Sequence, residues 1–184
     1  MVRLTQSFWS CLLLSSFACT SDNVPATNGT EETRDDSTAA IQTDTTFYVL
    51  ERDERGWGTQ IAYRLRNTTE DTMYAINCNG AISIAVEKKE PAGWRTFWAP
   101  ITNACLSPPF TIPPGETYNA PLSLWGAPPG GNAGPEFSDT TFDGVYRLVW
   151  WNLVSHYAED RQGFGDTLPL DLRVSNEFTL RARR

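Results

Sequence analysis

The sequence predicts an all-β fold, a sandwich or barrel built from about seven to eight short strands. Aromatic residues make up 12% of the chain, with seven Trp but only two Met, and this mix favours strands as the carriers of the core. Short apolar runs alternate with polar residues at a spacing of roughly ten residues, and no segment has a convincing helical period. Because the unpaired edges of a single open sheet are a liability, two packed layers are favoured.

Each predicted strand combines an alternating pattern with turn residues at its ends. In the clearest example, Ile61, Tyr63 and Leu65 alternate with polar or small neighbours, which gives the strand one apolar face. Asn, Asp and Gly lie between the strands, where they tolerate the backbone angles of tight turns. The stretch 126–142 is rich in Pro and Gly and is expected to lie outside the core. The predicted strands are residues 47–50, 60–66, 72–76, 82–87, 94–98, 118–124, 145–154 and 178–180.

The first 18 residues predict a secretory signal. Arg3 precedes a short apolar run, residues 8–14, which is too short to span a bilayer. Small residues follow up to Ala18, so the step from Ala18 to Cys19 satisfies ordinary signal peptidase and also resembles a bacterial lipobox. Under either cleavage we expect the mature chain to begin at Cys19.

The cysteines favour lipidation. Cys11 leaves with the signal, and the mature chain then holds Cys19, Cys78 and Cys105, an odd number for an oxidising compartment. Lipidation of Cys19 accounts for the odd thiol and leaves Cys78 and Cys105 free to pair. That disulfide would close a loop of about 28 residues and contribute about 3.5 kcal/mol on the chain-entropy model. The alternative is a soluble secreted protein in which Cys19 has no special role.

Residues 19–46 predict a flexible tether. They are rich in Thr, Ser, Asn and Asp, with six carboxylates against one arginine and almost no apolar side chain. This composition is typical of a solvated, disordered segment. The predicted organisation is therefore a signal peptide at 1–18, a lipid-anchored tether at 19–46 and a folded domain at 47–184.

Several turns and strands of the predicted domain recur in a known order. They are residues 63–69, Gly93 and Trp94 with Trp98, residues 114–116, Trp125 and residues 144–146. Together, over about residues 63–150, they resemble the bacterial intracellular proteinase inhibitor family and related immunoglobulin-like lipoprotein domains. The resemblance implies an immunoglobulin-like antiparallel β-sandwich with a non-enzymatic role. Because this chain has an export signal and a cysteine pair, the inhibitory residues are not carried over, and proteinase inhibition is an alternative only.

The sequence contains no recognisable catalytic or metal-binding motif. His156 is the single histidine, and without a GxSxG motif it is interpreted as a surface residue rather than a catalytic base. One histidine also argues against a zinc site, and no phosphate-binding glycine motif is present. A net charge of −7 argues against nucleic acid as a partner. We therefore expect no enzymatic activity, no cofactor and no metal, with loop carboxylates such as Asp139 and Asp143 as the weaker alternative.

The best candidate binding surface is the predicted strand 145–154, which is apolar on both faces. Its outer face is either sheltered by residues 126–142 or exposed as an aromatic platform. Under the second interpretation Arg147 and Trp151 project from one face, because they lie four residues apart on a strand. Arg and Trp are also the residue types most enriched at binding hot spots.

These observations lead us to expect a bacterial cell-envelope lipoprotein, held at the membrane through Cys19. Its domain would bind or scaffold another envelope protein. A glycan-binding accessory domain that uses Trp94, Trp98 or Trp151 is the alternative from a different class. An enzyme is the third interpretation.

Overall fold

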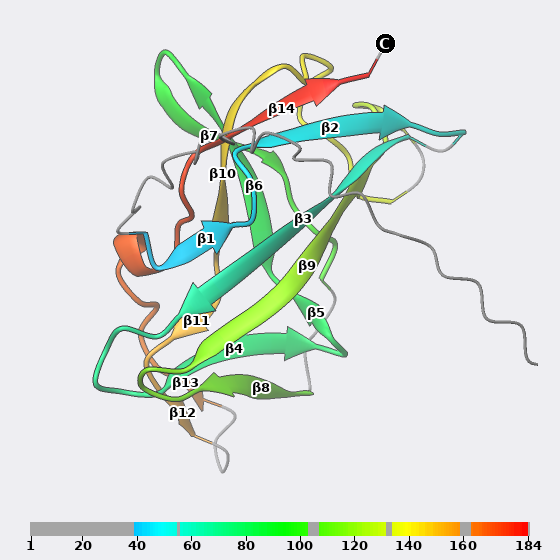
Figure 1. The fold of residues 1–184 in the computed structure, drawn as a ribbon. Coiled ribbons are helices and arrows are strands. Elements are labelled where there is room, and N and C mark those ends of the chain that lie inside the picture. The colour runs from blue at the N-terminus through cyan, green and yellow to red at the C-terminus, as the bar shows by residue number, and fades with distance from the viewer. Residues whose placement is uncertain (1–38, 55, 103–106, 132–133, 159–162, 184) are drawn as a thin grey trace, which may run out of the picture. The chain divides into compact units, whose positions relative to one another are not determined.

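The computed structural model describes residues 39–54, 56–102, 107–131, 134–158 and 163–183, all within one compact unit, Asp36–Arg184. The regular secondary structure of these residues consists almost entirely of β-strands (Figure 1). A single short 3-10 helix, η2 (Leu170–Leu172), is the helical element among them. The predicted all-β class is confirmed.

Nine strands have five or more residues in the described part of the chain. They are β2 (Phe47–Arg52), β3 (Trp57–Arg66), β4 (Met73–Cys78), β6 (Ile84–Glu90), β7 (Gly93–Trp98), β8 (Ser107–Ile112), β9 (Thr117–Gly126), β10 (Gly144–Trp150) and β14 (Phe178–Ala182). Five shorter strands complete the set. They are β1 (Ile41–Thr43), β5 (Ala81–Ile82), β11 (Leu153–Val154), β12 (Tyr157–Ala158) and β13 (Gly163–Phe164).

The main sheet has eight strands and folds over on itself at β2. Its order is β1-β3-β2-β14-β10-β6-β7, with β9 paired along the full length of β3. β2 pairs antiparallel with the start of β3 and parallel with β14, which is the one parallel pair among the named strands. Consequently β3 and β9 cross in front of β10 and β6 (Figure 1), giving the two layers of a β-sandwich.

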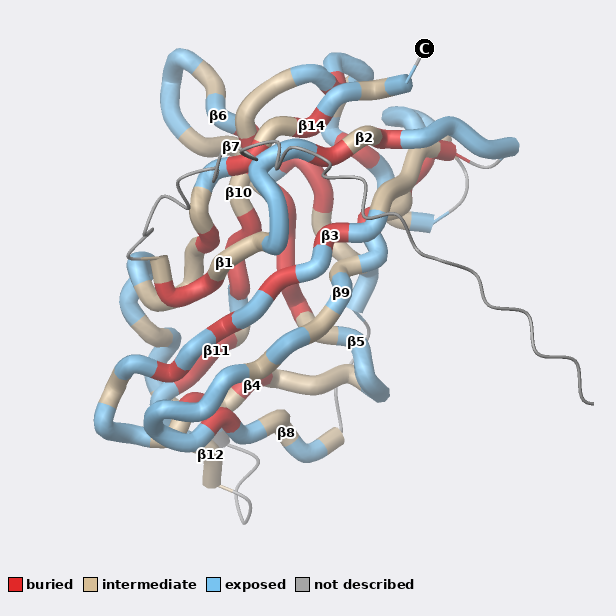
Figure 2. Tube along the Cα trace, viewed as in Figure 1, coloured by how far each residue is buried: buried red, intermediate tan, exposed pale blue. Residues whose placement is uncertain are grey.

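The core lies between these two layers. Ile61 and Leu65 on β3 are fully buried, as their alternation predicts, and Tyr63 between them is 5% exposed. Opposite them, Trp150 on β10 is fully buried, and its ring meets that of Tyr63 edge-on at a centroid distance of 6.1 Å. Figure 2 shows the buried segments along β3 and β10 in the middle of the fold. Burying one such side chain contributes about 1.5–3 kcal/mol.

The predicted strand 145–154 is bent, and the prediction of one continuous strand is wrong. β10 ends at Trp150, a turn follows, and β11 pairs with β4 in a second sheet. β5 and β6 are separated at the same level by Ser83, whose carbonyl accepts a hydrogen bond from the Trp151 N–H at 3.0 Å. The segments β5–β6 and β10–β11 therefore bend together at one corner, from the main sheet into the second sheet. The second sheet contains β11, β4, β5 and β8.

The folded domain begins earlier than predicted. Ile41 in β1 is fully buried and lies opposite Leu65 of β3, so the last part of the predicted tether, within 19–46, is a strand of the main sheet. One large apolar side chain in a polar segment is sufficient to add a short edge strand. Residues 19–38 of that tether lie outside the described residues, as does the predicted signal.

The stretch 126–142 also contributes to the core, contrary to the prediction. Phe137 is 1% exposed and Phe142 is 6% exposed. Their rings lie 5.1 and 6.0 Å from the ring of Phe97 on β7, and Ser138 N–H donates to the Phe97 carbonyl. This stretch covers β7 and not the region around Trp151, so it does not shelter the outer face of 145–154 as expected.

The buried side chain of Asn67 organises the junction after β3. Its Nδ2 donates to the carbonyls of Asp71 at 2.7 Å and Ile112 at 2.8 Å. Its Oδ1 accepts from the N–H and the hydroxyl of Thr69 at 3.0 and 2.7 Å. Its backbone exchanges hydrogen bonds with the turn at 115–116. One residue thus joins the β3–β4 loop to the β8–β9 turn.

The free edges of both sheets carry prolines. Neither the edge of β9 away from β3 nor that of β8 away from β4 pairs with any described strand. Pro121 lies within β9, and Pro108 and Pro109 lie within β8, beside an irregularity in the β4–β8 ladder. Proline has no N–H to offer to an incoming strand, so these positions oppose edge-to-edge pairing with another molecule.

Asn67→Ala should lower the free energy of unfolding by about 2–4 kcal/mol, because several buried polar groups lose their partner. Urea unfolding measures the change. Asn119→Ala, on an exposed position of β9, is the matched control and should alter stability by less than about 0.5 kcal/mol. Equal effects of the two substitutions would contradict an organising role for Asn67.

Candidate functional site

The structure does not bring Arg147 and Trp151 together as a pair of anchors. The Arg147 guanidinium lies 2.7 Å from the Glu87 carboxylate, with each side chain 16% exposed, and 4.4 Å from the centre of the Trp94 ring. Trp151 lies in the bend beyond β10 and is 39% exposed. The bend interrupts the alternation on which the prediction relied, and Arg147 already has partners within the chain.

The tryptophans considered for glycan binding form no common platform. Trp98 is 4% exposed, and its Nε1–H donates to the Trp125 carbonyl at 2.7 Å. The Trp94 ring has the cations of Lys89 and Arg147 within 5.6 and 4.4 Å of its centre. Of the three rings, Trp151 alone is exposed, so a shared stacking surface is absent from these positions.

Of the cysteines singled out in the sequence, Cys78 is described by the structure, and Cys19 and Cys105 lie outside the described residues. Cys78 ends β4 and is disulfide-bonded. Ser107, two residues after Cys105 in sequence, pairs with Asn77. This register suits a bond between Cys78 and Cys105, and that pairing stays a prediction.

The densest group of ionisable side chains is internally neutralised. Arg95 contacts the carboxylates of Glu90 at 2.6 Å and Asp139 at 2.5 Å, and Lys88 lies 3.7 Å from Asp139. The hydrogen bond from Arg95 lowers the pKa of Glu90. Burial acts to raise the pKa of Asp139, but hydrogen bonds from Thr141 and Arg95 outweigh it, and the pKa is lowered. Both carboxylates therefore stay ionised at neutral pH, which suits ion pairing and not proton donation.

The described residues contain neither a cluster of metal ligands nor a helix suited to crossing a membrane. No group of three or more His, Cys, Asp or Glu among them is placed to hold a metal ion. His156 is exposed, and its carbonyl accepts the Gly165 N–H at 2.8 Å. None of the described elements is a helix with the length and hydropathy to cross a membrane.

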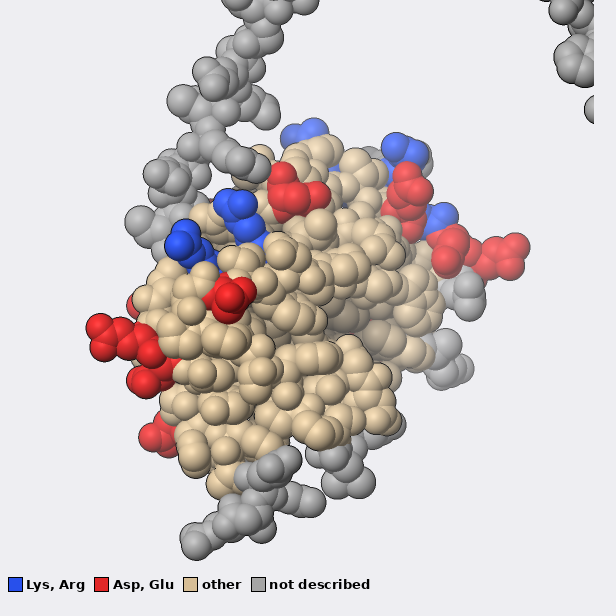
Figure 3. All heavy atoms as spheres, turned by 60° about the horizontal axis from the view of Figure 1, so that its bottom comes forward, with Lys and Arg blue, Asp and Glu red and all other residues tan. Residues whose placement is uncertain are grey.

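Among the described residues, the strands of the second sheet and of the adjoining hairpin form a broad face without charge. It consists of β4, β5, β8, β12 and β13, whose sequences contain no Asp, Glu, Lys or Arg, and we call these five strands the uncharged face. Figure 3 shows this side, with the charged side chains at its rim and a wide central area without them. Residues 159–162, between β12 and β13, lie outside the described residues.

Aromatic rings line this uncharged face. Tyr74 on β4 lies 6.4 Å from Tyr157 on β12, which lies 5.5 Å from Phe164 on β13, measured between ring centres. Phe164 is 43% exposed, and the two tyrosines are partly exposed. Phe110 on β8 and Tyr118 on β9, 5.9 Å apart, instead pack against the core on the other side of the second sheet. Aromatic enrichment with depletion of charge is typical of the centre of protein–protein interfaces.

Strand alternation does not reveal this face, because the face is assembled from separate segments. The absence of charge reveals only part of it. Residues 72–86 and 96–115, which include β4, β5 and β8, contain no charged side chain, although 20% of the whole chain is charged. β12 and β13 carry no such signal, because Glu159, Asp160 and Arg161 lie between them in the sequence.

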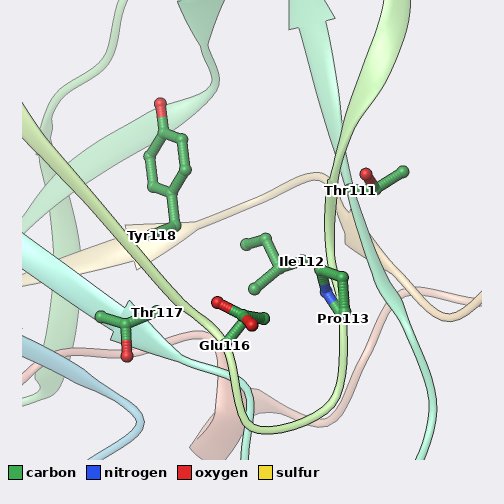
Figure 4. Close-up of a pocket in the computed structure, with 6 residues that line it drawn as sticks. All are labelled: Thr111, Ile112, Pro113, Glu116, Thr117 and Tyr118. Carbon is green, nitrogen blue, oxygen red and sulfur yellow. The ribbon is translucent and has the colours of Figure 1, made fainter.

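A pocket lies beside the uncharged face, where β8 and β9 diverge from their shared turn (Figure 4). Its volume is about 320 Å³, and its lining is Thr111, Ile112, Pro113, Glu116, Thr117 and Tyr118. Glu116 is the one charged residue in this lining. The close-up shows its side chain directed toward the space between Ile112 and Tyr118.

Comparisons with known proteins assign the chain to no family. No family model and no curated protein matches it. Among solved structures, the alkylpurine DNA glycosylase AlkC of Pseudomonas fluorescens, bound to DNA containing an abasic site analog, has a TM-score of 0.34 and 11% sequence identity. The alignment covers 79% of this chain and 32% of that one. A similarity of this size carries no argument about fold or function.

Trp151→Ala should reduce the free energy of unfolding by less than about 1 kcal/mol, because the ring is partly exposed beyond the end of β10. Trp150→Ala, one residue away, should cost about 3–5 kcal/mol because its ring is fully buried. Thermal and urea unfolding of both variants measure the difference. A loss for Trp151→Ala as large as that for Trp150→Ala would contradict this placement.

Proposed function

We propose that the protein is a bacterial cell-envelope lipoprotein whose domain binds another protein through the uncharged face. The observation that carries this proposal is a set of five strands without charge, lined by exposed and partly exposed aromatic rings, on a chain with a net charge of −7. A surface that meets only water usually presents charged side chains. Contiguous uncharged aromatic surface instead favours burial against a partner.

The ion pairs of the charged cluster favour binding over catalysis. The carboxylates of Glu90 and Asp139 are neutralised by Arg95 and Lys88, so neither is poised as a general acid. The proposed role is non-enzymatic and requires no cofactor.

Glycan binding is the second candidate, supported by the row formed by Tyr74, Tyr157 and Phe164. Exposed aromatic rings can stack on the faces of sugars. Successive rings in this row are tilted by 40° and 35°, so they form a faceted and not a flat surface. A faceted apolar surface is better suited to the irregular surface of a protein.

The proposed anchor would hold the domain near a membrane. The strands begin at Ile41, so about 20 residues would separate a lipidated Cys19 from the folded domain, with an r.m.s. reach of about 25 Å as a flexible coil. A disulfide between Cys78 and Cys105 would join the end of β4 to the segment before β8. It would thereby stiffen the proposed binding surface.

Cys19→Ser should release the protein from the membrane fraction, because several acyl chains on one residue anchor durably and their loss leaves only the domain. Cell fractionation followed by immunoblotting measures the distribution. Cys11→Ser, which alters a cysteine of the signal itself, is the control and should leave the membrane-bound fraction unchanged. Retention of the Cys19→Ser protein at the membrane would refute lipid anchoring.

Phe164→Asp should reduce capture of the envelope partner at least about tenfold, because it places a charge at an exposed ring of the uncharged face. Affinity capture from solubilised envelopes, quantified by mass spectrometry, measures the change. Phe47→Asp is the matched control, since Phe47 is 46% exposed on β2 of the main sheet. Undiminished capture by Phe164→Asp would contradict the proposed face. Capture of purified envelope polysaccharide in place of a protein would favour the glycan candidate.

A further inference from the structure

We propose that the pocket between β8 and β9 receives a lysine or arginine side chain of the protein partner, with the Glu116 carboxylate as its counter-charge. This proposal rests on the proposed function, because it specifies the partner's chemistry beside the uncharged face. Thr111, which lines the pocket, lies opposite Tyr74 in the β4–β8 ladder, so the pocket adjoins that face.

The size and lining of the pocket suit one long side chain. A volume of about 320 Å³ lies at the lower end of the roughly 300–1,000 Å³ typical of small-molecule sites. Pro113 and Tyr118 offer apolar surface above the buried Ile112, and Thr111 and Thr117 add hydroxyl groups. Lysine and arginine combine an apolar stem with a polar head, and they commonly pack the stem on apolar surface while the charge stays near polar groups.

The charge of the pocket is uncompensated within the described part of the chain. Glu87, Glu90 and Glu177 each meet a basic side chain within 2.8 Å. The Glu116 side chain has no ion pair or hydrogen bond to any described residue. A partner cation would therefore form a new charge-assisted contact without displacing an existing one.

Charged residues of both signs lie near the pocket. Arg66 lies opposite Thr117 in the β3–β9 ladder, yet it forms no ion pair with any described residue. Asp71 belongs to the adjoining loop, and its carbonyl and that of Ile112 bind the same Asn67 amide. Glu70 precedes it in sequence. The surroundings thus carry more acid than base, which favours a basic group in the pocket.

The position of Glu116 is fixed before any partner binds. Gly115 has a φ of 77°, a left-handed conformation that favours glycine, and its N–H donates to the Asn67 carbonyl. The Glu116 carbonyl in turn accepts the Asn67 N–H at 2.9 Å. A carboxylate on a backbone held in this way loses less entropy on binding than one on a mobile loop.

Titration of the full mature chain carrying Cys19→Ser with short blocked peptides tests the proposal. The probe is acetyl-Thr-Val-Lys-Val-Thr-amide, and two matched peptides carry norleucine or Glu in place of Lys. Amide chemical shifts of the ¹⁵N-labelled chain report binding even when it is weak. The Lys peptide should move the resonances of Glu116, Thr117 and Tyr118 and bind about five- to tenfold more tightly than the norleucine peptide. The Glu peptide should bind more weakly than either.

Glu116→Gln should abolish the preference for Lys over norleucine and leave the norleucine affinity unchanged. Glu54→Gln, which removes the same charge from the β2–β3 connection, is the matched control and should keep the preference. Equal binding of the Lys and norleucine peptides, no shifts at the pocket, or a preference that survives Glu116→Gln would each overturn the proposal. If any of these results occurs while Phe164→Asp still abolishes partner capture, the pocket assignment fails and the proposed function stands.

Discussion

The need to satisfy one buried amide determines how the two sheets meet. Asn67 is fully buried, and its polar groups are all satisfied by two segments, the β3–β4 loop and the end of β8 with the turn that follows it. An unsatisfied buried donor or acceptor costs about 1–3 kcal/mol, so the β3–β4 loop and the β8–β9 turn can occupy few other positions. The site depends on this constraint, because the same turn holds Glu116 and fixes the angle at which β8 leaves β9. The pocket between β8 and β9 is therefore a consequence of hydrogen-bond satisfaction in the core.

The second constraint is the corner at Trp151 and Ser83. Two neighbouring strands of the main sheet bend there together, which keeps their hydrogen bonding intact and turns the chain into a separate small sheet. Without that bend, β10 and β11 would continue as one straight strand and the main sheet would simply be longer. The bend instead gives the small sheet its own outward surface, and this surface is where the charged residues are missing.

Strands with one buried face were predictable, because β3 and β9 alternate in sequence as they alternate in space. β8 was not predictable, because its two prolines are typical of a loop. β1 was not predictable either, because it depends on the single buried side chain of Ile41. β5 had a sequence signal, Asn79–Gly80, whose φ values of 54° and 91° form the tight turn after β4. Arg147 and Trp151 were expected on one face because alternation in sequence cannot register the bend that follows β10. The uncharged face brings together distant segments, so its location required the tertiary fold.

The proposed lipid anchor would confine the protein to a surface, and the prolines in β8 and β9 would matter most there. An anchored protein moves in two dimensions, where copies collide far more often than they do in bulk solution. An ordinary exposed edge strand would then nucleate a growing ribbon of like molecules. Because prolines within β8 and β9 reduce the N–H groups at these edges, dense coverage of a membrane would be compatible with molecules that remain separate. Crowding then leaves each domain free to meet a different protein.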